Sequence, residues 1–137
     1  MDPGLRRDDG GSDMGVNGIG GFFFRAEDPE KLSSWYATHL GVGTGEYGVW
    51  QPQAGPSVFS PFKADTTYFA ADRKWMLNLR VDDLDGLTGG LREAGIEIIT
   101  NPEWDVPGLG RLVRIHDPEG NPIELWEPDL EGGAPSA

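Results

Sequence analysis

The sequence contains no cysteine, which excludes disulfides, thiolate nucleophiles and metal sites built from cysteine. Histidine is also scarce, because His39 and His116 are the only two in the chain. No apolar run is long enough to cross a bilayer, and the N-terminus lacks the apolar stretch of a signal peptide. We therefore expect a cytoplasmic protein whose chemistry depends neither on thiols nor on a cluster of imidazoles.

Basic residues are also few in this sequence. Eleven lysines and arginines stand against 23 aspartates and glutamates, which gives a net charge of -12. The overall field repels nucleic acid and anionic membranes, so neither is expected as a partner. A small-molecule ligand is easier to accommodate, because a buried pocket is governed by its own lining and not by the net charge.

The 137 residues are enough for one domain, and the aromatic residues can build a core. Residues 1–17 are rich in glycine and charge and predict a disordered tail, and residues 129–137 predict a second tail. Between them, residues 18–128 divide into two similar modules, 18–72 and 73–128. Residues 25–28 align with residues 80–83, which lie 55 positions later, and this match indicates an internal duplication.

Each module begins with a strand pattern, at residues 20–26 or 75–81, followed by an aspartate that can cap a helix. Asp28 precedes Pro29 and a helical stripe of apolar residues, and Asp83 precedes a second such stripe. Gly41 and Gly95 mark the helix ends. Three short strand patterns follow each helix, at 46–51, 57–62 and 66–70, and at 96–100, 110–116 and 122–127.

Residues 117–127, DPEGNPIELWE, resemble the hairpin that closes the second module of the vicinal oxygen chelate superfamily. This superfamily contains glyoxalases, bleomycin resistance proteins and dioxygenases. Together with the duplicated unit, the resemblance covers residues 18–128. It implies an α+β fold in which two βαβββ modules form a curved mixed sheet with a concave pocket. It also implies a homodimer, since many relatives complete their pockets across an interface.

Strand alternation separates a helix-facing set of side chains from a pocket-facing set. A turn through residues 117–121 places Arg114 opposite Glu124 on the pocket-facing side. Aromatic side chains there could stack a planar ligand or simply fill the core. Arginines at the strand ends could bind an anionic group or pair with nearby acidic residues. The predicted ligand-binding residues are Phe23, Arg25, Tyr68, Met76, Asn78, Arg80, Arg114, His116, Glu124 and Trp126.

Metal-dependent members of the superfamily hold a divalent ion with four side chains, and the resemblance places these positions at Gly21, Tyr68, Met76 and Glu124. Only Glu124 is an ordinary metal ligand, whereas a catalytic site takes about three from the protein. No cofactor is therefore predicted, and any displaced metal would involve Glu124. His39 lies near a helix end, where a solvated position is the simpler interpretation.

Glu124 has a structural and a functional interpretation. It could form a buried ion pair with Arg114, or it could serve as a general base or ligand acceptor in a water-poor pocket. The favoured function is a metal-free protein that binds a small molecule. The alternative is a glyoxalase-like lyase or ring-cleaving dioxygenase, with Glu124 and Tyr68 as catalytic residues. A third hypothesis is a vestigial pocket whose sheet edge serves assembly.

Overall fold

A computed structural model describes residues 15–16 and 18–129 of the chain. The described residues contain the helices α1 (Pro29–Leu40) and α2 (Leu84–Glu93), and the strands β1 (Leu77–Arg80), β2 (Gly110–His116) and β3 (Pro122–Pro128). Two short 3₁₀ turns, η2 (Glu46–Gly48) and η3 (Pro102–Trp104), lie between them. Apart from residues 15, 16 and 129, the two predicted tails lie outside the described residues.

The three strands form a mixed sheet in the order β1-β3-β2. β1 runs parallel to β3, and β2 runs antiparallel to it. One face carries Ile115, Ile123 and Leu125, which are completely buried, and Leu79 beside them. The helix-facing alternation predicted for these strands is confirmed. The polar side chains of the site lie on the opposite face.

Both predicted helices form with the expected caps. The Asp28 carboxylate accepts a hydrogen bond from the Lys31 amide at 3.1 Å, and α1 ends at Gly41, whose φ of 68° lies in the left-handed region. Leu32 and Tyr36 from its apolar stripe are buried in the core. No helix in the described part of the chain is long and apolar enough to span a membrane.

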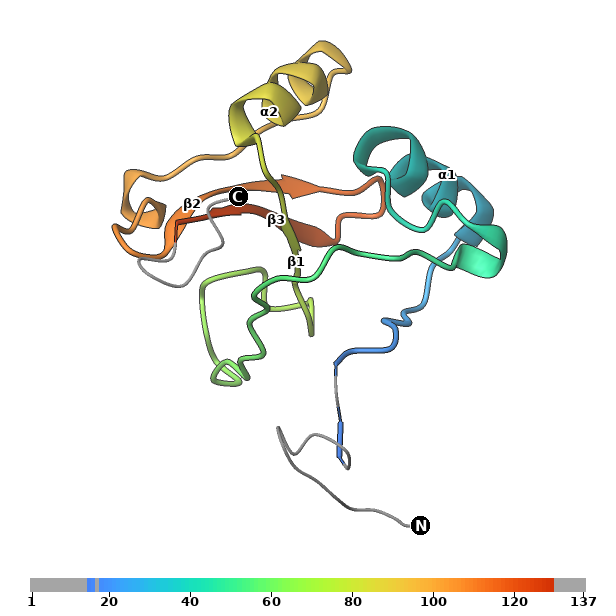
Figure 1. Ribbon diagram of the computed structural model, residues 1–137, viewed down its shortest axis with the longest axis horizontal. Coiled ribbons are helices and arrows are strands. Elements are labelled where there is room, and N and C mark those ends of the chain that lie inside the picture. The colour runs from blue at the N-terminus through green and yellow to red at the C-terminus, as the bar shows by residue number, and fades with distance from the viewer. Residues whose placement is uncertain (1–14, 17, 130–137) are drawn as a thin grey trace.

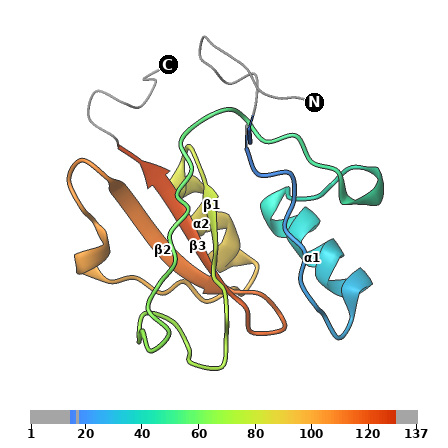
Figure 2. The ribbon, with the colours of Figure 1, turned by 90° about the horizontal axis from the view of Figure 1, so that it is seen from below.

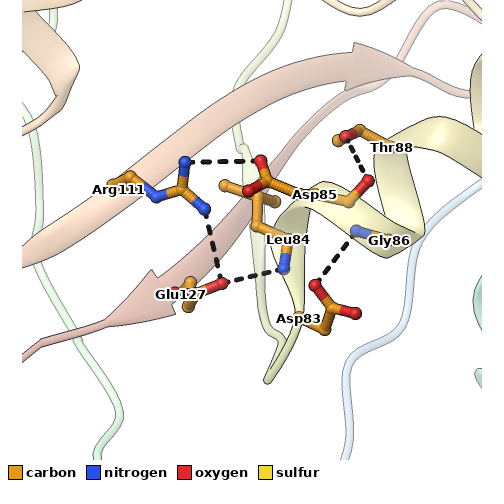
Figure 3. Close-up of polar contacts among 7 residues, drawn as sticks. All are labelled: Asp83, Leu84, Asp85, Gly86, Thr88, Arg111 and Glu127. Carbon is orange, nitrogen blue, oxygen red and sulfur yellow. Dashed lines mark hydrogen bonds and ion pairs between the residues drawn. The ribbon is translucent and has the colours of Figure 1, made fainter.

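The N-terminus of α2 is attached to the sheet by a small polar network (Figure 3). Glu127 of β3 accepts a hydrogen bond from the Leu84 amide at 2.8 Å, while Asp83 accepts one from the Gly86 amide at 3.0 Å. Arg111 of β2 lies 3.4 Å from Asp85 and 3.6 Å from Glu127. Because these bonds satisfy amides in the first turn, they fix the helix over one face of the sheet.

The two faces of the sheet have different covers (Figure 1). α2 lies over the apolar face, and the segment between α1 and β1 passes across the opposite face. α1 lies beside the end of the β2–β3 hairpin, as the second view also shows (Figure 2). The sheet therefore separates a helix-covered core from a face covered by irregular chain.

The strands expected in the first module do not form. Residues 20–26, 57–62 and 66–70 have no ladder partner among the described residues, and residues 46–51 contain the η2 turn. Five glycines and three prolines lie between residues 41 and 61, and each proline lacks the amide hydrogen that a sheet requires. Residues 96–100 contribute only an isolated bridge, between Ile99 and Arg114. The strand patterns indicated extended chain in these segments, but they could not identify the neighbouring strand with which each segment would pair.

The turn between β2 and β3 connects the two halves of the chain. Asp117 is buried, and its carboxylate accepts hydrogen bonds from the amides of Glu119 and Asn121 and from the Tyr36 hydroxyl at 2.7 Å. The Glu119 carboxylate accepts bonds from the amides of Glu27 and Asp28, at 2.9 and 3.0 Å. The motif that carries the family resemblance thus holds α1 in place.

Candidate functional site

Glu124 lies at the centre of the middle strand, on the face opposite the core. Its side chain is buried, with 6% of the residue exposed. One carboxylate oxygen accepts a hydrogen bond from the Asn78 amide group at 2.8 Å, and the other accepts one from the Tyr68 hydroxyl at 2.5 Å. Both oxygens therefore have a protein donor, as buried polar groups in folded proteins usually do.

Tyr68 approaches the sheet from the irregular segment that crosses this face. Burial and the bond to Glu124 raise the pKa of the Tyr68 hydroxyl to about 12, although the nearby charge of Arg114 opposes the shift. The hydroxyl therefore keeps its proton at neutral pH and donates it toward Glu124. The pair combines a hydrogen-bond donor and an acceptor at one point of the site.

Arg114 is directly opposite Glu124 in the β2–β3 register and is almost fully buried, with 8% exposed. Its guanidinium carbon lies 4.9 Å from the centre of the Tyr68 ring and 5.2 Å from that of Trp104. These are cation–π contacts. The Nε and Nη2 atoms are buried and have no hydrogen-bond partner among the described residues.

The predicted ion pair between Arg114 and Glu124 does not form, although the predicted register is confirmed. Within the described chain, no nitrogen of Arg114 is recorded within 4.0 Å of a Glu124 oxygen. Tyr68 is the physical reason, because its hydroxyl bonds to Glu124 while its ring contacts the Arg114 guanidinium. Instead of a direct ion pair, the side chain of Tyr68 thus contacts both the Glu124 carboxylate and the Arg114 guanidinium.

Three further predicted residues lie on the same face but have other contacts. Arg80 donates to the carbonyl oxygens of Pro56 and Gln53, at 2.6 and 2.5 Å, and so holds the irregular segment against the sheet. Trp126 is buried, and its indole nitrogen donates to the Leu109 carbonyl at 3.0 Å. Met76 lines a separate cavity formed by residues 60–76.

The other residues predicted to bind a ligand lie outside this cluster. Phe23 is 92% exposed, and neither Phe23 nor Arg25 has a recorded contact with Glu124 or Arg114. His116 is exposed at the end of β2, where it pairs in register with Pro122. The structure therefore gathers Tyr68, Asn78, Arg114 and Glu124, and it leaves Phe23, Arg25 and His116 outside.

Trp104 is the residue of the cluster that sequence reasoning missed. It ends the η3 turn, whose first residue follows Asn101, and the Asn101 side chain accepts a hydrogen bond from the Glu103 amide. The bridge between Ile99 and Arg114 brings this turn to the sheet. An asparagine before proline is a helix-start signal that could have located the turn, but nothing in the sequence indicates that its tryptophan contacts an arginine.

The divalent metal site implied by the superfamily does not fit these residues. Of the four positions, Tyr68 and Glu124 bond to each other, while Gly21 has no side chain and Met76 offers only a thioether. Among the described residues, no three histidine, aspartate or glutamate side chains are arranged to hold an ion. The groups that the cluster presents are a carboxylate, a phenol, a guanidinium and aromatic rings.

The sequence matches the Glyoxalase/Bleomycin resistance protein/Dioxygenase superfamily over residues 18–125. The chain belongs to this superfamily. A solved structure supports the fold assignment. TnmS3, an antibiotic binding protein from Streptomyces sp. CB03234, superposes with a TM-score of 0.55 and 25% sequence identity, covering 85% of this chain and 99% of that one.

Two relatives match a shorter segment. The anthracycline biosynthesis protein DnrV of Streptomyces peucetius is 38% identical over 60 residues, and DauV of Streptomyces sp. (strain C5), which has the same description, is 35% identical over 60 residues. Each match covers 44% of this chain and 22% of the relative. The matched segment therefore spans about a fifth of the length of these relatives.

Proposed function

We propose that this protein binds a planar aromatic small molecule on the polar face of its sheet, beside Arg114 and Glu124, without a metal ion. The observation that carries the proposal is that Arg114 is buried while two of its side-chain nitrogens lack a hydrogen-bond partner among the described residues. A buried guanidinium with unpartnered nitrogens costs free energy that a folded protein usually avoids. A ligand oxygen near Nε or Nη2 would supply the missing acceptor.

The shape of the cluster favours an aromatic ligand. Tyr68 and Trp104 lie 6.2 Å apart with an interplanar angle of 63°, so they present one ring face and one ring edge. A planar ring that enters beside them gains stacking contacts of about 1 kcal/mol for each aromatic pair. TnmS3 is described as an antibiotic binding protein, and DnrV and DauV are named for anthracycline biosynthesis, which supports this ligand class.

The proposal can be tested by titrating the full chain with daunorubicin, a planar anthracycline, and following the ligand fluorescence. We expect saturable binding to one site, and no binding of kanamycin, which lacks an aromatic ring. Trp104→Ala removes one ring of the cluster and should weaken binding about tenfold. Tyr47→Ala is the matched control, since Tyr47 is 96% exposed. Equal losses in both variants, or no binding by the unmodified chain, would contradict the proposal.

The metal-free part of the proposal has its own test. Purified protein is analysed for bound zinc, nickel, iron and manganese before and after dialysis against a chelator. We expect substoichiometric metal throughout and the same daunorubicin affinity in both samples. A stoichiometric metal that disappears in Glu124→Ala would overturn the metal-free assignment, because it would show that this carboxylate is a ligand.

A second candidate function rests on the short contact between Tyr68 and Glu124. A phenol that keeps its proton and a carboxylate form an acid and a base for proton transfer, as in a glyoxalase-like lyase. Turnover of the methylglyoxal–glutathione hemithioacetal that is lost in both Tyr68→Phe and Glu124→Gln would support this candidate. Turnover that survives in both would reject it. The ring-cleaving dioxygenase alternative has no such support, because the metal positions do not fit.

We further propose that the two βαβββ modules and their concave pocket are completed in a homodimer. Phe23 and Phe59 are 92% and 88% exposed, and the extended segments around them have no strand partner. Such surfaces are typical of chain that pairs with another molecule. Light scattering after size exclusion should give twice the mass of one chain. A monomer at every concentration up to the millimolar range would reject the dimer, while daunorubicin binding could survive.

A further inference from the structure

The segment between α1 and β1 forms an open cavity of about 400 Å³ that the proposed function does not use. Its lining residues lie between positions 60 and 76, on the side of the sheet opposite α2 (Figure 1). Neither Glu124, Asn78, Arg114 nor Trp104 lines it. A volume of this size accommodates a small aromatic molecule.

The lining combines aromatic walls with positive charge. Its aromatic and basic members are Phe62, Phe69, Trp75, Lys63, Arg73 and Lys74. In the part of the chain that the structure describes, no aspartate or glutamate contributes to the lining. In a chain whose acidic residues outnumber its basic residues by 23 to 11, this composition differs from that of the chain as a whole. It favours a ligand that is both apolar and anionic.

The aromatic walls are held by ring contacts. Phe62 and Phe69 have their centroids 5.8 Å apart, and Trp75 has Phe22 and Phe24 at 4.9 and 5.0 Å. Trp75 is therefore packed against two rings and immediately precedes Met76 and β1. These contacts pre-organise the walls, so little side-chain freedom remains to be lost when a ring enters.

The charge of Arg73 is held in place but not neutralised. Its Nη1 and Nη2 atoms donate to the Asn121 side-chain oxygen at 3.1 Å and the Glu119 carbonyl at 2.9 Å, and both acceptors are uncharged. Among the described residues, its one recorded ion-pair contact is with Asp72, at 4.0 Å, whose side chain is 80% exposed. An exposed pair at this distance contributes little. The guanidinium thus leaves a fixed positive potential at the cavity.

Lys63 and Lys74 also line the cavity, and both are exposed. A lysine ammonium on a flexible stem can move to meet an anionic group. Within the described chain, neither ammonium has a recorded ion pair with an acidic side chain. Two lysines on flexible stems and one arginine held by neutral acceptors therefore line the cavity beside its aromatic rings.

We propose that this cavity is a second binding site, which takes a small aromatic carboxylate. The ring would lie between the Phe62–Phe69 pair and Trp75, and the carboxylate would face Lys63, Arg73 and Lys74. This site goes beyond the proposed function and does not rest on it, because it uses none of the residues around Glu124. Phe62 connects the two regions, since its ring lies 5.6 Å from that of Tyr68.

The experiment titrates the full chain with naphthoate and, separately, with naphthamide, the uncharged molecule of the same shape. Binding is followed by calorimetry and by the NMR signal of the Trp75 indole. We expect naphthoate to bind and to shift that signal, and naphthamide to bind about tenfold more weakly. Raising the salt concentration should reduce the difference between the two ligands.

The double variant Lys63→Gln, Lys74→Gln should weaken naphthoate binding about tenfold and leave naphthamide unchanged. Lys31→Gln, Arg92→Gln is the matched control, because it removes the same charge from exposed helix positions outside the cavity. Equal affinity for naphthoate and naphthamide, or equal losses in both double variants, would overturn the proposal. Trp104→Ala should not affect naphthoate, which separates this site from the one beside Arg114.

Discussion

The sequence predicts two copies of one unit, residues 18–72 and 73–128, but among the described residues only the second half builds a sheet. β1, β2 and β3 all lie in the second half, and Ile115, Ile123 and Leu125 on their apolar face are completely buried. The first half contributes α1 and a long irregular segment with exposed aromatic residues. The difference shows that a strand pattern is a preference for extended chain, while a strand also requires a neighbour for its hydrogen bonds.

The largest effect on this comparison is expected from removing the Asp117 carboxylate, one of the two side chains in the turn that hold α1. Asp117→Ala leaves the Tyr36 hydroxyl, the Asn121 amide group and two backbone amides without their acceptor. Each lost bond costs about 1 kcal/mol, so we expect a loss of about 4 kcal/mol in the free energy of unfolding. Urea denaturation measures it. Asp72→Ala, at an 80% exposed side chain, is the control and should change stability by less than about 0.5 kcal/mol.

The second test compares one apolar residue from each half. Leu125 is completely buried in the sheet, so Leu125→Ala should cost about 3 kcal/mol through the cavity that it leaves. Phe59 is 88% exposed, so Phe59→Ala should cost less than about 0.5 kcal/mol in the monomer. Both are measured by urea denaturation at low protein concentration. Similar costs in the two variants would show that the first half has a core that its exposed surface conceals.

A smaller effect is expected at Glu119, which holds the first half through two partly exposed bonds. Glu119→Ala removes the acceptor from the amides of Glu27 and Asp28. We expect a loss of about 1 kcal/mol. Hydrogen exchange should become faster at the start of α1 and stay unchanged in β3. Faster exchange in β3 as well would mean that the two halves unfold together.

The smallest effect is a pH dependence that comes from the contact between Tyr68 and Glu124. Burial and the bond to Glu124 raise the pKa of Tyr68 from 10.0 to about 12 in the folded protein. The folded state therefore binds this proton more tightly than the unfolded state, so the stabilisation is complete below pH about 10 and is lost as the pH rises to about 12. The melting temperature should fall over this range, and less steeply in Tyr68→Phe. Identical profiles would show that this bond does not contribute.

The second half could be predicted well from the sequence because its signals are local. Asp83 caps α2, and the alternation of Val113, Ile115, Ile123 and Leu125 identifies the buried face. The turn at residues 117–121 fixes the register that brings Arg114 opposite Glu124. Each of these predictions needs only neighbours in sequence or a turn of known length.

The first half and the detailed contacts could not be predicted in the same way. Whether residues 20–26 form a strand depends on a partner, which alternation does not identify. The ion pair of Arg114 with Glu124 was a reasonable inference from register, but Tyr68 reaches this place from a segment without regular structure. The contact of Trp104 depends on a turn that is joined to the sheet by a single bridge.

The Glu119 and Asp117 contacts also have a consequence for the order in which the chain can acquire its structure during synthesis. The bonds of Glu27 and Tyr36 to this turn span 92 and 81 residues. The first helix therefore leaves the ribosome long before its anchoring groups do, and contacts of such wide separation form slowly. Its exposed aromatic neighbours must remain soluble until the last hairpin has been made. Residues 1–109, which precede the hairpin, carry 17 acidic and 9 basic side chains, and this net negative charge can keep the unfinished chains apart during the interval.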